Sequence, residues 1–170
     1  MKPYGKKSPQ LGRGVFVAPN ATVIGEVVVG DRSSVWFNAV VRADVNYVRI
    51  GSLTNVQDSC VLHVTTKKFP LIIGDQVTIG HGCILHGCRI GNKCLIGMGA
   101  VVLDGAVIGE GSVVASGSIV LQGAVIPPRT LVAGVPAASK KEVGPEVLDE
   151  IERSALEYAE LASSYLGEPL

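Results

Sequence analysis

A spacing of six residues between aliphatic side chains runs through most of the chain. The spacing occurs at Val17, Val23, Val29, Val35 and Val41, at Ile50, Val56 and Leu62, and again at Ile73, Ile79, Leu85, Ile90, Ile96, Val102, Ile108, Val114, Val120, Ile126 and Val132, with one rung shortened before Ile90. A short fixed period of this kind indicates a β-helix, because each rung buries its aliphatic side chain only when similar rungs stack on it. Three rungs are expected to make one triangular coil.

The last part of the chain has the spacing of an amphipathic helix. From Gly144-Pro145 onward, apolar residues recur at intervals of three and four, as an apolar helix face requires. These residues are Leu148, Ile151, Ala155, Tyr158, Ala162 and Tyr165, and Gly167 is expected to end the helix. We therefore divide the chain into a β-helix domain at 1–138 and a C-terminal helical segment at 139–170 that packs on the β-helix.

Composition and charge argue against several classes of protein. The 15 Lys and Arg residues balance the 15 Asp and Glu residues, and no basic stripe is present, so a nucleic-acid partner is not expected. No apolar stretch approaches the ~18 residues of a membrane span. We expect a cytoplasmic protein without a membrane partner, in which the cysteines stay reduced. Packing in the core is the expected role of Cys60, Cys83 and Cys94, and it is also favoured over metal ligation for Cys88.

Two of the three histidines share one column of the repeat. His63 follows Leu62, and His86 follows Leu85. Because successive strand residues point to opposite sides, both histidines should point outward while the leucines point inward. The rungs between them make one full coil, so the two imidazoles are expected to lie about 4.8 Å apart, the spacing between neighbouring strands. That separation suits two ligands of one metal ion.

The third histidine, His81, is expected to complete the site from a neighbouring subunit. His81 lies near a corner, two places after Ile79, and an extended chain puts it about 15 Å from His86, too far for one ion. In a parallel homotrimer, a corner of one chain would abut a flat face of the next and bring His81 there. Three neutral imidazoles with an open fourth position suit catalytic Zn²⁺, and Fe²⁺ or Co²⁺ would also be accepted.

The polar residues around the histidines resemble those of the gamma-class carbonic anhydrases. The resemblance rests on Arg42-Ala-Asp44, Asn55-Val-Gln57-Asp58, His63, His81-Gly82 and His86, in this order and spacing. Rungs such as Ile73-Gly-Asp-Gln-Val-Thr are similar to the pattern of the hexapeptide-repeat family, and this likeness spans residues 11–137. The resemblance implies an all-β fold, a left-handed parallel β-helix with a C-terminal α-helix, assembled as a homotrimer.

The resemblance also implies an activity and a role for each polar residue. A zinc-bound hydroxide would hydrate carbon dioxide reversibly to bicarbonate at the trimer interface. The metal ligands would be His63, His81 and His86, and the ion pairs at the interface would involve Arg42, Asp44 and Asp58. Gln57 would orient the zinc-bound hydroxide, with Asn55 nearby, and Tyr158 would lie near the metal. From the residues alone, turn formation by Asn55 and helix packing of Tyr158 remain alternative explanations.

The chain departs from the family pattern where protons would leave the site. Well-known members carry an acidic loop after the first ligand and a glutamate after the Arg-x-Asp motif. This chain has Val64-Thr-Thr-Lys-Lys-Phe-Pro and Val45 at these places, which implies weak proton export. Three other functions stay open, since one fold hosts several activities: a hexapeptide-repeat acyltransferase, a CoA thioesterase on the same metal site, and a non-catalytic trimer stapled by metal.

Overall fold

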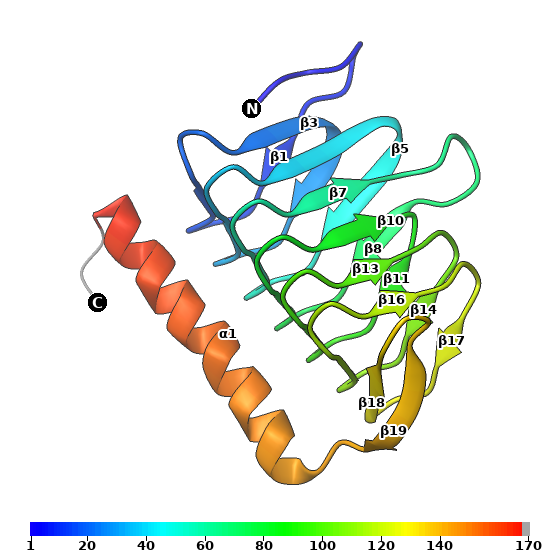
Figure 1. The fold of residues 1–170 in the computed structure, drawn as a ribbon. Helices are drawn as coiled ribbons and strands as arrows, with labels where there is room; N and C mark the ends of the chain where they lie inside the picture. Colours follow the sequence, from blue (N-terminus) through cyan, green and yellow to red (C-terminus); the bar gives the residue numbers. More distant parts are fainter. Residues whose placement is uncertain (168–170) are drawn as a thin grey trace.

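The computed structural model describes residues 1–167 and shows a stack of coils (Figure 1). Buried aliphatic side chains form three columns inside this stack. In one column Val41 pairs with Leu62, and Leu62 pairs with Leu85 in the next coil. All three side chains are fully buried. The six-residue spacing therefore places each aliphatic residue directly on the one in the preceding coil, and the stack is a parallel β-helix. The predicted class, a left-handed parallel β-helix with a C-terminal helix, is confirmed.

Two of the three faces of the β-helix are joined through long strands that continue around a corner. The first face consists of β3 (Thr22–Val29), β5 (Val40–Ile50), β7 (Val61–His63), β10 (Ile84–His86), β13 (Val101–Val102) and β16 (Ile119–Val120). The second face contains the later parts of β3 and β5 together with β1 (Gln10–Leu11), β8 (Leu71–Ile73), β11 (Arg89–Ile90), β14 (Val107–Ile108) and β17 (Val125–Ile126). Every pair of neighbouring strands on these faces is parallel.

The third face ends in a strand that the sequence analysis assigned to the helical segment. This face consists of β2 (Phe16–Val17), β4 (Ser34–Val35), β6 (Asn55–Val56), β9 (Thr78–Ile79), β12 (Leu95–Ile96), β15 (Val113–Val114), β18 (Thr130–Ala133) and β19 (Ala138–Glu142). β19 pairs antiparallel with β18. It covers the hydrogen-bonding edge of the last coil, which would otherwise be open to pairing with another chain. Residues 139–142 of the C-terminal segment thus form a strand, and the helix begins at Pro145, where the helical spacing starts.

The C-terminal helix α1 (Pro145–Leu166) runs back along the third face toward the first coils (Figure 1). Pro145 occupies the first turn, where its missing N–H costs nothing, and Gly167 ends the helix in the left-handed conformation at a φ of 75°. Its buried face consists of Ile151, Ala155, Ala159 and Ala162. Within residues 1–167 there is no helix with the length and apolar character needed to cross a membrane.

The four cysteines pack inside the β-helix, as the repeat predicted. Cys60, Cys83, Cys88 and Cys94 are fully buried and free. Burial raises the pKa of Cys88 to about 12 and the pKa of Cys94 to about 11. Both thiols therefore stay protonated at neutral pH, and a protonated, buried thiol is a poor metal ligand.

Candidate metal centre

His63 and His86 face each other on the outer side of the first face. The two residues are in register on the neighbouring strands β7 and β10. Their ring centroids lie 5.1 Å apart, and Nδ1 of His63 lies 3.1 Å from Nε2 of His86. The stacking predicted from the repeat is confirmed, because Leu62 and Leu85 point inward one place earlier on the same strands.

The other nitrogen of each imidazole meets a carboxylate. Nε2 of His63 lies 3.1 Å from Oδ1 of Asp44, and Nδ1 of His86 lies 2.8 Å from Oδ1 of Asp104. A neutral imidazole that donates its N–H to a carboxylate presents a lone pair at its other nitrogen. The two nitrogens that face each other are then both acceptors, the arrangement typical of metal-binding histidines.

The spacing of the facing nitrogens fits a divalent metal ion. A tetrahedral zinc ion with nitrogens at 2.0–2.1 Å holds two of its ligands about 3.3 Å apart. The observed 3.1 Å between His63 and His86 is close to that value, so the pair could take two adjacent coordination positions without movement of the strands. Among residues 1–167, a single chain offers no group of three or more His, Cys, Asp or Glu side chains that could hold a metal ion.

Asp44 connects the histidine pair to Arg42. Nη1 of Arg42 donates to Oδ2 of Asp44 at 2.5 Å, while Oδ1 of Asp44 faces His63. Burial favours a raised pKa for Asp44, but the hydrogen bonds from Arg42 and His63 outweigh it and hold the pKa of this carboxyl below its usual value. Asp44 is therefore ionised at neutral pH and suited to accept a hydrogen bond from the Nε2–H of His63. The structure brings Arg42 and Asp44 together and places Asp58 elsewhere.

His81 and Asp58 belong to a second group of polar residues, at the third face. Nδ1 of His81 lies 2.7 Å from Oδ2 of Asp58. His81 stands directly before Gly82, whose φ of 70° turns the chain at the corner. Gln57 and His81 line the same pocket, about 280 Å³ in volume, beneath Ser154 of α1. His81 thus lies at a corner apart from the His63–His86 pair, as the sequence predicted.

Gln57 and Asn55 are held in a hydrogen-bonded row on the third face. Nε2 of Gln57 donates to Oδ1 of Asn55 at 3.1 Å, and Nδ2 of Asn55 donates to Oγ1 of Thr78 at 3.0 Å. Both amide side chains are buried. A buried amide with fixed hydrogen-bond partners has one orientation. The Gln57 side chain is therefore held in one orientation at the pocket that His81 also lines.

Tyr158 belongs to the second group as well. Its ring packs edge to face on Trp36, with centroids 5.5 Å apart. Burial raises the pKa of Tyr158, and the negative charge of Asp58 raises it further. Packing of α1 on the third face is thus sufficient to explain the position of this tyrosine, and a role beside the metal stays a prediction.

Asp104 and Thr65 were not identified from the sequence. Asp104 accepts a hydrogen bond from Oγ1 of Thr65 at 2.8 Å, in addition to its contact with His86. The repeat contains a signal for Asp104, since Leu85 pairs with Val102 and the aspartate therefore falls opposite Gly87, beside His86. Thr65 lies in the irregular segment 64–70, whose conformation the repeat does not specify.

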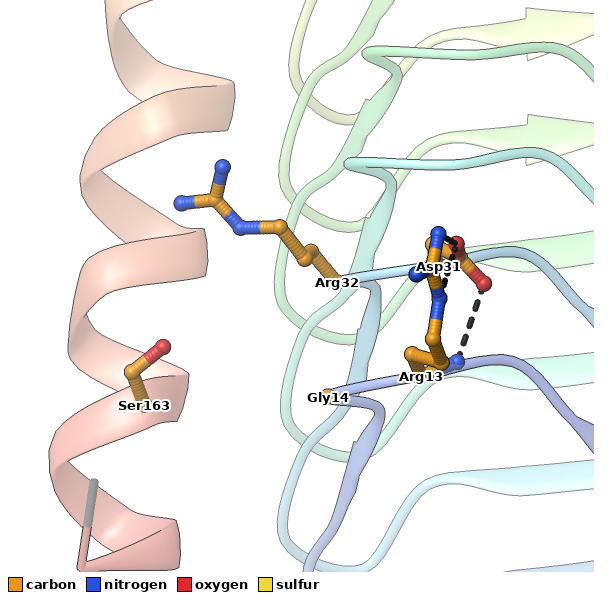
Figure 2. Close-up of a pocket in the computed structure, with 5 residues that line it drawn as sticks. All are labelled: Arg13, Gly14, Asp31, Arg32 and Ser163. Carbon is orange, nitrogen blue, oxygen red and sulfur yellow. Dashed lines mark hydrogen bonds and ion pairs between the residues drawn. The ribbon is translucent and has the colours of Figure 1, made fainter.

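A separate pocket lies between α1 and the first coils (Figure 2). Its lining residues are Arg13, Gly14, Asp31, Arg32 and Ser163. The backbone N–H of Arg13 and its guanidinium donate to Asp31, and these hydrogen bonds lower the pKa of Asp31. Figure 2 shows Arg32 extended toward the helix. The pocket contains none of the predicted site residues.

Comparison with known proteins places the chain among the carbonic anhydrases. A probable carbonic anhydrase of Methanocaldococcus jannaschii is 51% identical over 154 residues, which cover 91% of this chain and 96% of the relative. A carbonic anhydrase of Geobacillus kaustophilus is 44% identical, with coverage of 96% and 89%. The mitochondrial gamma carbonic anhydrase 1 of Arabidopsis thaliana is 42% identical over 95% of this chain, which spans 61% of the plant protein.

A family model and two solved structures match the hexapeptide-repeat fold of this chain. The family model described as bacterial transferase hexapeptide (six repeats) matches residues 8–43 and 87–122. A Bacillus cereus protein with a provisional acetyltransferase name is 46% identical, with a TM-score of 0.94 and coverage of 96% of this chain and 95% of that one. A hexapeptide transferase family protein of Anaplasma phagocytophilum is 39% identical, with a TM-score of 0.92 and coverage of 96% of both chains.

The fold and the paired histidines together define a hexapeptide-repeat protein with a candidate metal centre. Relatives at 42–51% identity, matched over more than nine tenths of this chain, carry the carbonic anhydrase name. The chain belongs to the gamma carbonic anhydrase family.

Proposed function

We propose that this protein is a metal-dependent carbonic anhydrase that converts carbon dioxide reversibly to bicarbonate at a site shared between subunits of a homotrimer. The observation that carries the proposal is the His63–His86 pair, with facing nitrogens 3.1 Å apart and a carboxylate behind each ring. A divalent metal ion, when bound, supplies a Lewis acid that lowers the pKa of water to about 7. Zn²⁺ suits the histidine ligands, and Fe²⁺ or Co²⁺ are accepted by the same donors.

The trimer is inferred from two half-sites that lie on different faces of one chain. The first half-site is the His63–His86 pair on the first face, and the second is His81 with Gln57 at the third face. Each is incomplete alone, since a catalytic zinc takes three protein ligands. A threefold axis parallel to the β-helix would set the His81 corner of one subunit against the His63–His86 pair of the next.

Exposed apolar side chains beside the histidines support an interface at this face. Val61 and Ile84 each lie two places before a histidine on the same strand, so they point to the same side as His63 and His86. They are 41% and 43% exposed. Apolar groups beside a polar site are typical of a surface that a partner subunit covers.

Replacing both apolar residues with lysine should dissociate the trimer. We expect the double variant Val61→Lys, Ile84→Lys to run as a monomer of 17.7 kDa in light scattering, because two buried charges per interface cost several kcal/mol. Val125→Lys serves as the matched control, since Val125 is 70% exposed on the second face and should leave the trimer intact. A double variant that stays trimeric would place the interface on another face.

Within such a site, the side chains of this chain hold and orient the reactants. Asp44 fixes the ring of His63, and Asp58 fixes the ring of His81. Gln57, held by Asn55, offers its amide to the reacting oxygen on the neighbouring subunit. Arg42 keeps Asp44 ionised and fixed in place.

Proton transfer to the solvent is expected to limit turnover. The segment 64–70 beside His63 carries Lys67 and Lys68 and no carboxylate or histidine, so it offers no group that titrates near neutral pH. Adding imidazole buffer should raise kcat several-fold and leave kcat/KM for carbon dioxide unchanged. Lys67→Glu should raise kcat at low buffer concentration. A kcat independent of buffer would mean that another residue exports the proton.

The proposal is tested by loading the full-length protein with Zn²⁺, Fe²⁺ or Co²⁺ and measuring metal content, solution mass and carbon dioxide hydration by stopped flow. We expect about one ion per chain in a trimer, and hydration that His63→Ala abolishes. A trimer that takes up no metal would contradict the proposal. A metal-loaded trimer that does not hydrate carbon dioxide would favour the alternative of a non-catalytic trimer held together by metal.

The acyltransferase alternative has one specific observation in its favour, the transferase names of two similar solved structures. The same preparation is therefore also assayed for transfer or hydrolysis of acetyl-CoA. Turnover of acetyl-CoA without hydration of carbon dioxide would favour an acyltransferase or a CoA thioesterase instead.

A further inference from the structure

The carboxylate of Asp104 stands directly behind His86. Oδ1 of Asp104 lies 2.8 Å from Nδ1 of His86, while Nε2 of the same ring faces His63. The geometry points to Asp104 as a positioning residue, which holds the proton of His86 on Nδ1 and keeps the lone pair of Nε2 directed at the metal. The inference rests on the proposed function, since it assigns His86 as a ligand.

Thr65 fixes the carboxylate of Asp104 from the other side. Oγ1 of Thr65 donates to Oδ2 of Asp104 at 2.8 Å, so each carboxylate oxygen has one partner. The backbone of Thr65 is fixed in turn, because its carbonyl accepts from Nδ2 of Asn46 at 3.0 Å and its N–H donates to Phe69 at 3.0 Å. Asp104 therefore meets His86 with a fixed orientation.

Gly87 provides the room in which Asp104 reaches His86. A Cβ atom at residue 87 would overlap Oδ1 of Asp104 and would lie 2.7 Å from Cβ of Phe69. The φ of Gly87 is +53°, a conformation that glycine adopts without strain. The residue after the predicted ligand is thus glycine where any side chain would push the carboxylate away from the ring.

Each proposed ligand has the same arrangement. Asp44 lies behind His63, Asp58 behind His81 and Asp104 behind His86, with nitrogen–oxygen distances of 3.1, 2.7 and 2.8 Å. A carboxylate that accepts the second N–H of a ligand imidazole fixes its tautomer and increases its basicity. Of the three carboxylates, Asp104 has no place in the resemblance to the gamma-class motif.

The test compares Asp104→Ala and Asp104→Asn with the wild type in the full-length trimer. Zn²⁺ affinity is measured by competition with a chelator, and the tautomer of His86 is read from imidazole ¹⁵N shifts of the metal-free protein at about pH 8.5, where imidazoles are neutral. His86→Gln assigns the signals. Asp75→Ala is the matched control, since Asp75 accepts a hydrogen bond from the backbone of Ser52 at another corner.

We expect Asp104→Ala to weaken Zn²⁺ binding about 10- to 100-fold and to give a mixture of His86 tautomers. Asp104→Asn should restore the Nδ1–H tautomer and part of the affinity, because its carbonyl still accepts. Thr65→Val should cost less than Asp104→Ala. Asp75→Ala should change neither readout.

If the tautomer of His86 is unchanged in Asp104→Ala, the inference is wrong, whether or not Zn²⁺ affinity falls. A loss of affinity alone does not support it, because a purely structural role of Asp104 would have the same effect. If Asp104→Ala does not fold, the wild-type protein alone tests the inference, which is wrong if His86 carries its proton on Nε2. If the wild-type protein binds no Zn²⁺, the proposed function is wrong. The tautomer of His86 in the metal-free protein would still test the role of Asp104.

Discussion

Mixing two inactive variants, His63→Ala and His81→Ala, should restore metal binding and activity. Alone, each variant is expected to lose carbon dioxide hydration by more than about 100-fold, because removing only an outer partner of a metal ligand already costs about 10- to 100-fold. In a mixed trimer, one interface joins an intact His63–His86 pair to an intact His81 of the neighbouring chain. We expect one restored site in each mixed trimer.

The mixing experiment depends on the separation of the half-sites. His81 is bound to Asp58 at a corner, whereas His63 and His86 face each other on the first face. The variants are unfolded together, refolded together, and assayed for metal per trimer and for hydration. The control mixes His63→Ala with His86→Ala, both in the same half-site, and should restore nothing. Equal recovery in both mixtures would contradict a site shared between chains.

Leu85→Ala should destabilise the protein by about 2–5 kcal/mol. Leu85 is fully buried, and it stacks between Leu62 and Val102 in the column behind the histidines. Its removal leaves a cavity that neighbouring coils can fill only by moving. Because His86 follows Leu85 on the same strand, the variant should also bind Zn²⁺ more weakly.

The stability change is measured by urea unfolding at a fixed protein concentration, because trimer assembly makes the midpoint depend on concentration. Val125→Ala is the control, since Val125 is 70% exposed, and it should change the free energy of unfolding by less than about 0.5 kcal/mol. A loss below about 1 kcal/mol for Leu85→Ala would mean that the aliphatic column does not carry the stability of the coils.

The six-residue spacing was enough to predict how the coils stack and where the histidines lie on them. Because every coil repeats the same rungs, counting aliphatic residues was enough to stack Leu62 on Leu85 and therefore His63 on His86. The same counting placed His81 at a separate corner. The helical spacing after Pro145 and the stop at Gly167 were also sufficient to predict α1.

The contacts between particular side chains were seen only in the folded chain. Within one chain, Asp58 pairs with His81, and Arg42 pairs with Asp44. These choices depend on side-chain rotamers, and the repeat specifies only the positions of the backbone.

The conformation of the segments outside the repeat was likewise seen only in the folded chain. Thr65 reaches Asp104 because the segment 64–70 folds back on the coil, a contact between residues 39 apart in sequence. β19 forms because the last coil leaves an open strand edge, for which the six-residue spacing contains no signal. A periodic sequence thus predicts the contacts that every coil repeats. Contacts that occur only once, such as Thr65 with Asp104, are seen only in the folded chain.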